Sequence, residues 1–308
     1  MTAPALSEVT SESPCPICTR TTWCGVSDDR RTVICRRVSF GCRTLATDRA
    51  GVPYFIHNLE SLDDPGRLGR CSRETRNSSS RTRRTTLSPA QLDVGYRAIL
   101  GALHLADGHR TSLIQRGLTT EQVDQGGYKS LPSSGRHELG AAVLGALPVA
   151  LARELPGLAA PGIGGGTEWR CVGASGLVVP VRNIDGLIIA LKVRRDSTGS
   201  GPKYVYVSSS RVGGASPGAP AHVPIFAAAN RDKCRLTEGE LKSDIATVLS
   251  GMRTISVSGA GNWRTALPIL HELGVKSVRL AFDADARRNP HVALALVQAA
   301  RALSREGY

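Results

Sequence analysis

Aromatic residues are scarce in this sequence, and long apolar runs are missing from it. Phenylalanine, tryptophan and tyrosine together make up 4% of the 308 residues. The chain has no run of about 18 apolar residues, which argues against a membrane-spanning helix. The first residues have neither a basic start nor an apolar stretch, so no secretory signal is visible. These absences predict a cytoplasmic protein without a membrane partner.

The chain has instead an excess of positive charge. Its 39 lysines and arginines outnumber its 26 acidic residues, which gives a formal net charge of +13. Basic surfaces attract phosphate backbones through counterion release, with little regard to base sequence. The charge therefore favours a nucleic acid as partner, although frequent arginine is also typical of GC-rich genomes and does not decide the matter alone.

Cysteines are concentrated near the amino terminus, at Cys15, Cys18, Cys24, Cys35 and Cys42. A Cys-x-x-Cys turn presents two thiolates to one metal ion, and tetrahedral zinc needs two further ligands. We expect Cys15, Cys18, Cys24 and Cys35 to bind a structural zinc ion, with Cys42 as the substitute ligand. The alternative is a set of reduced cysteines that pack together without metal.

Aromatic and basic side chains stand among these cysteines, namely Trp23, Arg36, Arg37 and Phe40. Proteins that hold single-stranded nucleic acid stack bases on aromatic rings and bind the backbone with basic side chains. These four residues are therefore candidates for contacts with a single strand. Trp23 is equally suited to packing inside a small zinc-binding unit.

Composition divides the chain into five segments. They are a cysteine-rich segment, a basic linker, a helical segment and two segments that contain strands, at residues 12–62, 63–88, 89–157, 158–230 and 231–308. The linker is rich in arginine and serine and is too polar to fold alone. The helical segment opens with Ser88-Pro89, an N-cap followed by a proline in the first turn.

The last two segments predict an α/β fold. GLVVPVRNIDGLIIALKVRR, residues 176–195, is typical of a hairpin around an Asp-Gly turn, and GPKYVYVSS adds a further strand. After Ile225 strands alternate with helices, which predicts a parallel sheet with helices on its faces. In the helix that ends near Gly251, we expect one apolar stripe, made of Leu241, Ile245, Val248 and Leu249.

Acidic residues follow two strands of this predicted sheet. Glu238 ends one apolar run, whereas Asp283 and Asp285 end another and stand two residues apart. Because ligands bind beyond the carboxyl ends of parallel strands, we expect these three side chains to meet at one edge. Converging carboxylates repel each other, and a divalent cation relieves that repulsion. The pattern predicts a Mg²⁺ or Mn²⁺ site, and solvated loop acids are the alternative.

These motifs resemble a known family. Thr237-Glu238-Gly239, the strand SVSGAG at 256–261 and FDAD at 282–285 resemble the Toprim fold that topoisomerases and bacterial primases share. The hairpin and GPKYVYVSS resemble the basic half of the polymerase core of DnaG-type primases, and the cysteine-rich segment resembles their zinc ribbon. The order of the parts is most similar to primase-like proteins of plasmids, phages and other mobile elements.

The resemblance implies a complete architecture. An amino-terminal zinc ribbon and a small helical segment would precede a primase core. In that core, a mixed β subdomain at 158–230 would be followed by a Toprim-like parallel sheet flanked by helices at 231–308. The Toprim domain is expected to be truncated at its carboxyl terminus.

The resemblance also implies roles for single residues. Glu238, Asp283 and Asp285 would be the catalytic residues and the ligands of Mg²⁺, and Glu238 is also suited to act as general acid or base. Template or nucleotide phosphates would be bound by basic residues of the core, at Arg182, Lys192, Arg194, Lys203 and Lys242. The alternative for these basic residues is an ordinary solvated face.

The function that follows is primer synthesis in DNA replication. The chain would be a DNA primase, a nucleotidyltransferase that joins ribonucleoside triphosphates on a single-stranded DNA template, with a replicative helicase as a further candidate partner. Two other functions are compatible with the sequence. One is a catalytically silent replication factor that binds single-stranded DNA, and the other is a Toprim nuclease.

Overall fold

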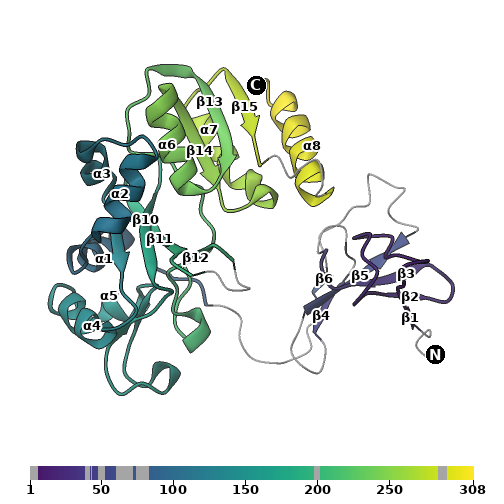
Figure 1. Cartoon of the computed structure of the whole chain (residues 1–308), viewed down its shortest axis with the longest axis horizontal. Helices are drawn as coiled ribbons and strands as arrows, with labels where there is room; N and C mark the ends of the chain where they lie inside the picture. Colours follow the sequence, from purple (N-terminus) through teal and green to yellow (C-terminus); the bar gives the residue numbers. More distant parts are fainter. Residues whose placement is uncertain are drawn as a thin grey trace. The chain divides into compact units, whose positions relative to one another are not determined.

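The computed structural model describes residues 6–38, 42, 44–47, 53–59, 72–73, 83–197, 202–283 and 290–308. The chain divides into two compact units (Figure 1). The first comprises Met1–Ser79 and Arg288–His291, and the second comprises Ser80–Arg287 and Val292–Tyr308. Each unit is described by itself. Of the predicted basic linker, residues 63–71 and 74–82 lie outside the described residues.

The first unit contains a mostly antiparallel sheet with strand order β1-β2-β3-β5-β4-β6. The bounds are Leu6–Glu8 (β1), Gly25–Ser27 (β2), Thr32–Cys35 (β3), Thr44–Thr47 (β4), Pro53–Asn58 (β5) and Ser72–Arg73 (β6). β3 ends at Cys35, one of the predicted zinc ligands, and pairs with β5. The core of this unit is small and includes the buried side chains of Cys15, Cys24 and Cys35. A core this small gives limited stability by itself, so a bound metal ion would add to the stability of the unit.

The second unit begins with helices, as the sequence predicts. They are Pro89–Gly101 (α1), Asp107–Gln115 (α2), Thr120–Gly126 (α3), Arg136–Gly145 (α4) and Val149–Glu154 (α5). Ser88 caps α1 with a capping box, and α3 ends at Gly127 with a positive φ of 70°. Residues just before α1 also belong to this unit, since Arg83 pairs with Glu154 and the Thr85 backbone N–H donates to Ser216 at 3.1 Å.

A four-stranded antiparallel sheet, in the order β12-β11-β10-β7, packs against these helices. Its strands are Lys129–Leu131 (β7), Gly176–Arg182 (β10), Ile188–Arg195 (β11) and Tyr204–Tyr206 (β12). β10 and β11 form the predicted hairpin, and Gly186 has the positive φ, 78°, that its tight turn requires. β7 lies within the segment predicted to be helical, where three residues are too short to show a strand pattern.

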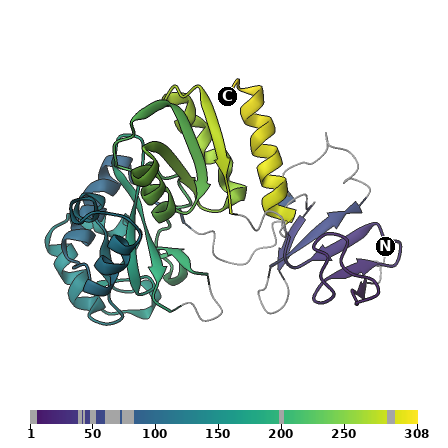
Figure 2. The same ribbon diagram turned by 45° about the horizontal axis from the view of Figure 1, so that its top comes forward.

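A parallel sheet of order β14-β13-β15 completes the second unit. Its elements are Asn230–Glu238 (β13), Glu240–Ser250 (α6), Met252–Val257 (β14), Leu267–Glu272 (α7), Ser277–Ala281 (β15) and Pro290–Arg305 (α8). α6 lies on one side of the sheet, and α7 and α8 pack on the other (Figures 1 and 2). No helix within the described ranges is long and apolar enough to cross a membrane.

The buried face of α6 differs from the predicted stripe. Leu241 is buried, but Leu249 is 64% exposed. The other fully buried side chains of this helix are polar, namely Glu240, Ser243, Asp244 and Thr247. Ile245 and Val248 are partly buried and pack against the same cluster as Leu241, so of the four predicted residues Leu249 alone departs from the stripe. The polar side chains are buried because α6 lies between two sheets, where partners from distant segments form hydrogen bonds with them. Buried polar groups are tolerated when they are hydrogen-bonded.

Candidate active site and metal centre

A cleft of about 820 Å³ opens at the carboxyl ends of the parallel strands. β13 is the central strand and ends at Glu238, and the register pairs Thr237 with Ala281 of the neighbouring β15. Asp283 follows β15 by two residues, so it reaches the same edge of the sheet as Glu238. The expected meeting of acids at the carboxyl ends of these strands is therefore seen for Glu238 and Asp283, the residues that we call the rim acids.

The carboxylate of Glu238 is held in an unfavourable setting. Its Oε1 atom is buried and has no hydrogen-bond partner. Burial raises the pKa of Glu238, and the nearby charge of Asp283 raises it further, although backbone N–H groups of Asp283 and Ala260 donate hydrogen bonds that act in the opposite direction. An orphaned carboxylate oxygen beside a second acid is the donor arrangement that a hard divalent cation satisfies.

Asp283 lies at the exposed end of the site and forms an ion pair with Lys242 of α6. Asp285, the third predicted acid, lies outside the described residues. The two rim acids alone are hard oxygen ligands that fit Mg²⁺ or Mn²⁺, which takes few protein ligands and keeps several waters. Within the described ranges, the only group of three or more side chains close enough to share one metal ion is the cysteine cluster.

Basic side chains also line the cleft. Arg116, at the end of α2, and Lys203, before β12, are exposed, and Tyr204 stands next to them. Arg194 of β11 is partly buried and has an Nε atom without a partner. A cleft lined by both acids and cations suits a polyphosphate bound together with a metal ion.

Lys192 enters the cleft from β11, but its side chain is only 7% exposed. The Nζ atom donates to Glu240 Oε1 at 2.8 Å and to Ser258 Oγ at 3.0 Å, and it lies 4.8 Å from the centre of the Tyr206 ring. The ion pair between Lys192 and Glu240 joins β11 of the antiparallel sheet to the start of α6. Its assignment as a phosphate-binding residue stays a prediction, and the contacts with Glu240 argue against it.

A second buried pair joins the same two parts of the unit. Asp244 of α6 accepts hydrogen bonds from His222 Nε2 at 3.0 Å and from the Tyr128 hydroxyl at 2.7 Å. Because His222 Nδ1 accepts the backbone N–H of Arg182, the ring carries its proton on Nε2. We call Lys192–Glu240 and His222–Asp244 the buried pairs. The sequence offered no signal for them, since their members are far apart in the chain.

Arg182 belongs to this network rather than to the cleft. Its side chain is 4% exposed, and Nη2 donates to the backbone oxygen of Gly126 at 2.9 Å. Burial lowers the pKa of this guanidinium, and Asp244 nearby acts in the opposite direction. The predicted contact of Arg182 with phosphate is untested, and burial leaves little surface for it.

The four cysteines chosen from the sequence form one cluster. The ligand atoms of Cys15, Cys18, Cys24 and Cys35 all lie within 4.8 Å of one another, and Cys18 Sγ is 3.6 Å from Cys24 Sγ. Burial raises the pKa of Cys15 to about 11. Such thiols lose their protons when a metal binds, and four thiolates leave no open position on a tetrahedral zinc ion. Cys42 is outside the cluster and is disulfide-bonded.

Trp23 stands beside this cluster and is 69% exposed. Its φ of 69° is a left-handed conformation that a bulky residue rarely adopts. The Arg37 guanidinium lies 5.8 Å from the ring centre, and its Nη1 atom donates to the Thr22 backbone oxygen at 2.7 Å. The ring is thus held outward beside a cation, which favours stacking over packing. Phe40 lies outside the described residues.

Solved structures of similar fold are bacterial primases. A DNA primase domain from Pseudomonas aeruginosa aligns with a TM-score of 0.50 and 20% identity, over 68% of this chain and 66% of that one. The RNA polymerase domain of Mycobacterium tuberculosis primase DnaG, in complex with a double-stranded DNA oligomer with a 6-nucleotide overhang, aligns with a TM-score of 0.50 and 18% identity, over 64% of this chain and 65% of that one. No protein-family model and no curated protein matches the sequence.

The chain has the primase core fold. Its structural neighbours are DnaG primase catalytic cores, and the expected fold class is confirmed in its α/β architecture, its amino-terminal cysteine cluster and its parallel sheet. The chain spans about half, 49%, of the Aquifex aeolicus primase structure that holds zinc-binding and RNA polymerase domains, at 18% identity and a TM-score of 0.48 over 64% of this chain. The Toprim assignment and an origin in mobile elements stay predictions.

Proposed function

We propose that the chain is a primase that makes short RNA primers on single-stranded DNA by metal-dependent nucleotidyl transfer. The observation that carries this proposal is the pair of rim acids, where the partnerless Glu238 Oε1 atom and the Asp283 carboxylate face a basic cleft at the ends of parallel strands. The primase core fold supports the same function. The cleft would accept ribonucleoside triphosphates.

In this proposal the rim acids, together with Asp285, hold Mg²⁺ or Mn²⁺. The bound ion would neutralise charge on the triphosphate. Lys203 and Arg116, which line the same cleft, would bind phosphate oxygens. Arg194, whose Nε atom has no partner, is a further candidate for such a contact. Catalysis of phosphoryl transfer rests mainly on positioning and on charge stabilisation, which this arrangement of fixed charges supplies.

The first unit would hold the template. We propose that Cys15, Cys18, Cys24 and Cys35 bind one structural zinc ion and that bases stack on Trp23 beside Arg37. Metal analysis of the purified chain tests the zinc assignment. We expect about one zinc per chain, lost in Cys18→Ser and kept in Cys171→Ala, which removes a buried thiol outside the cluster. A zinc content that is unchanged in Cys18→Ser contradicts the assignment.

Primer synthesis itself is tested with single-stranded DNA, four ribonucleoside triphosphates and Mg²⁺ or Mn²⁺. We expect short RNA products from the wild-type chain and none from Asp283→Asn with Asp285→Asn. Asp232→Asn is the matched control, because Asp232 also pairs with a lysine, Lys276, but outside the cleft. Undiminished synthesis by the double variant overturns the proposal, and cleavage of the DNA in the same assay would favour the nuclease.

One observation favours the silent DNA-binding factor as second candidate. Lys242 forms an ion pair with Asp283 and offsets its charge. A silent factor binds single-stranded DNA but shows no Mn²⁺-dependent nucleotide binding, whereas a primase shows both. The proposal also includes a cytoplasmic location, a replicative helicase as partner and the five segments given by composition.

A further inference from the structure

Lys242 is in an unusual place for a lysine. It is the third residue of α6, whose first residue is Glu240. The amino-terminal end of a helix carries partial positive charge, so a cation in the first turn is unfavourable there and an anion is favourable. Helix stability therefore does not account for this residue. Local conflicts of this kind are expected where a side chain serves a site.

The ammonium group of Lys242 is directed to the rim acids. It forms an ion pair with Asp283 Oδ1, and the two side chains are 48% and 54% exposed. Its charge also acts on Glu238, since it opposes the effects that burial and Asp283 have on that carboxylate. Lys242, Glu238 and Asp283 all line the same cleft. The half-exposed Lys242 ammonium group therefore acts on both rim acids, Glu238 and Asp283.

We propose that Lys242 is a tethered cation that competes with the divalent metal ion for Asp283 and thereby lowers metal affinity in the nucleotide-free chain. This inference rests on the proposed function of the same site, because it takes the rim acids as metal ligands. The ammonium group is paired with Asp283 Oδ1, an oxygen that would otherwise be free to bind the metal ion. Its positive charge also repels a divalent ion bound nearby. Both effects act in the same direction.

The expected effect of Lys242 on metal affinity is small. An exposed ion pair is weak, and a single charge near a divalent ion is screened by water. We therefore expect removal of the Lys242 charge to tighten divalent-metal binding by about three- to tenfold.

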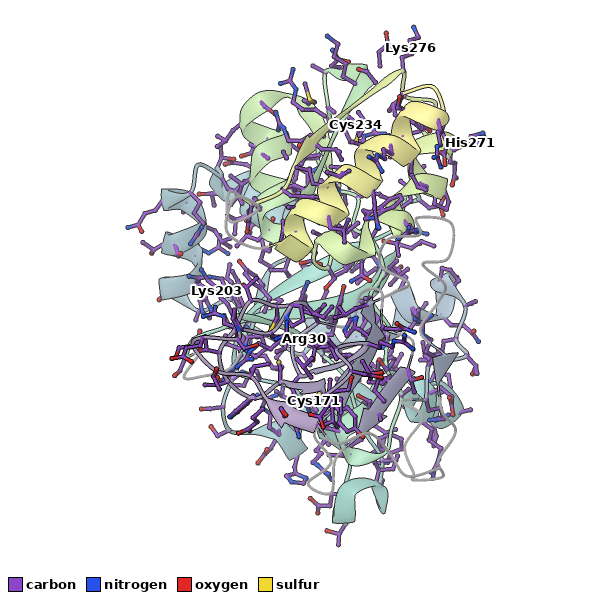
Figure 3. The ribbon with its side chains drawn as sticks, turned by 90° about the vertical axis from the view of Figure 1, so that its right-hand side faces the viewer. Arg30, Cys171, Lys203, Cys234, His271 and Lys276 are labelled. Carbon is purple, nitrogen blue, oxygen red and sulfur yellow. The ribbon has the colours of Figure 1, made fainter. Side chains whose placement is uncertain are left out.

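The experiment measures Mn²⁺ binding by electron paramagnetic resonance of the free ion, without nucleotide, on the full chain. The variants are Lys242→Gln, Lys242→Arg and, as matched control, Lys276→Gln. Lys276 also pairs with an aspartate and is 77% exposed. Lys276 comes directly before β15, and Figure 3 shows it apart from Lys203, which lines the cleft. Lys242→Gln replaces a half-exposed side chain, so the fold is expected to persist.

We expect about three- to tenfold tighter binding in Lys242→Gln, less than twofold change in Lys276→Gln and near wild-type binding in Lys242→Arg. Adding Asp283→Asn to Lys242→Gln is expected to abolish the gain. Equal or weaker binding in Lys242→Gln overturns the inference, and so does an equal gain in Lys276→Gln.

The outcomes separate this inference from the proposed function. If Mn²⁺ binds equally well to wild type and Lys242→Gln, the inference about Lys242 is overturned and the proposed function stands. Tighter binding in Lys242→Gln, combined with a wild-type chain that makes no primers, supports the inference and removes primer synthesis. Absence of Mn²⁺ binding in every variant overturns both.

Discussion

The rim acids and the buried pairs place carboxylates of neighbouring residues in opposite settings. Glu238 and Glu240 stand two residues apart, at the end of β13 and the start of α6. Glu240 is 1% exposed and is paired through Oε1 with Lys192, whereas Glu238 lines the cleft together with Asp283. One oxygen of each glutamate, Oε2 of Glu240 and Oε1 of Glu238, lacks a hydrogen-bond partner, so the ion pair with Lys192 is what separates the two settings. A buried charge is tolerated when it is paired, and an unpaired one opposes folding. The buried pairs therefore serve the structure, and the rim acids are left for a ligand.

The largest expected effect separates activity from stability at the rim. Replacing Glu238 by Gln and Asp283 by Asn should lower primer synthesis by about 100-fold or more, because charge stabilisation in the transition state is lost. The thermal midpoint should not fall, since burial and Asp283 already disfavour the charged form of Glu238. Steady-state synthesis and thermal unfolding of the same variant check both statements. If the double variant unfolds at a much lower temperature than wild type, the rim acids also serve the stability of the fold, which contradicts the account.

The next effect is on stability at the His222–Asp244 pair. Asp244→Ala removes the acceptor of two buried hydrogen bonds and leaves His222 Nε2 and the Tyr128 hydroxyl without that partner. We expect a loss of about 3–5 kcal/mol in the free energy of unfolding, measured by urea denaturation. The matched control is Asp232→Ala, which removes an exposed aspartate and should cost less than about 1 kcal/mol. Equal losses in the two variants would mean that the buried pair has no special role.

The smallest effect is expected when both members of a buried pair are replaced together. Lys192→Met alone leaves Glu240 buried and uncompensated and should cost about 3–5 kcal/mol. Adding Glu240→Met should restore most of that loss, because an apolar pair of similar volume often replaces a buried ion pair without cost. Denaturation of the two single variants and the double variant forms a cycle. Additive losses would show that the two side chains do not act as a pair.

The parts that sequence predicted well depend on neighbours in the chain. The Cys-x-x-Cys turn, the Asp-Gly hairpin between β10 and β11, and the Ser88-Pro89 start of α1 are local patterns, and each is present. The position of Glu238 beside Asp283 also followed from a simple rule about the ends of parallel strands. These features need only spacing and strand order.

The parts that sequence did not predict depend on distant partners. Tyr128 and Asp244 are 116 residues apart, and no pattern around either residue announces their hydrogen bond. For the same reason no local pattern indicates that Ser243, Asp244 and Thr247 of α6 are buried. The resemblance assigned Lys192 and Arg182 to phosphate binding, and no local pattern indicates that they are buried either. Their burial is decided by α6 and by the segment that carries His222.

The most direct measurement is a crystal structure of the full chain grown or soaked with Mn²⁺, with anomalous difference maps recorded near the manganese edge. The account predicts a peak between the carboxylates of Glu238 and Asp283, with the Lys242 ammonium group moved away from Asp283. A well-ordered cleft with no peak there, or with Lys242 still paired to Asp283 while manganese binds elsewhere, would contradict it.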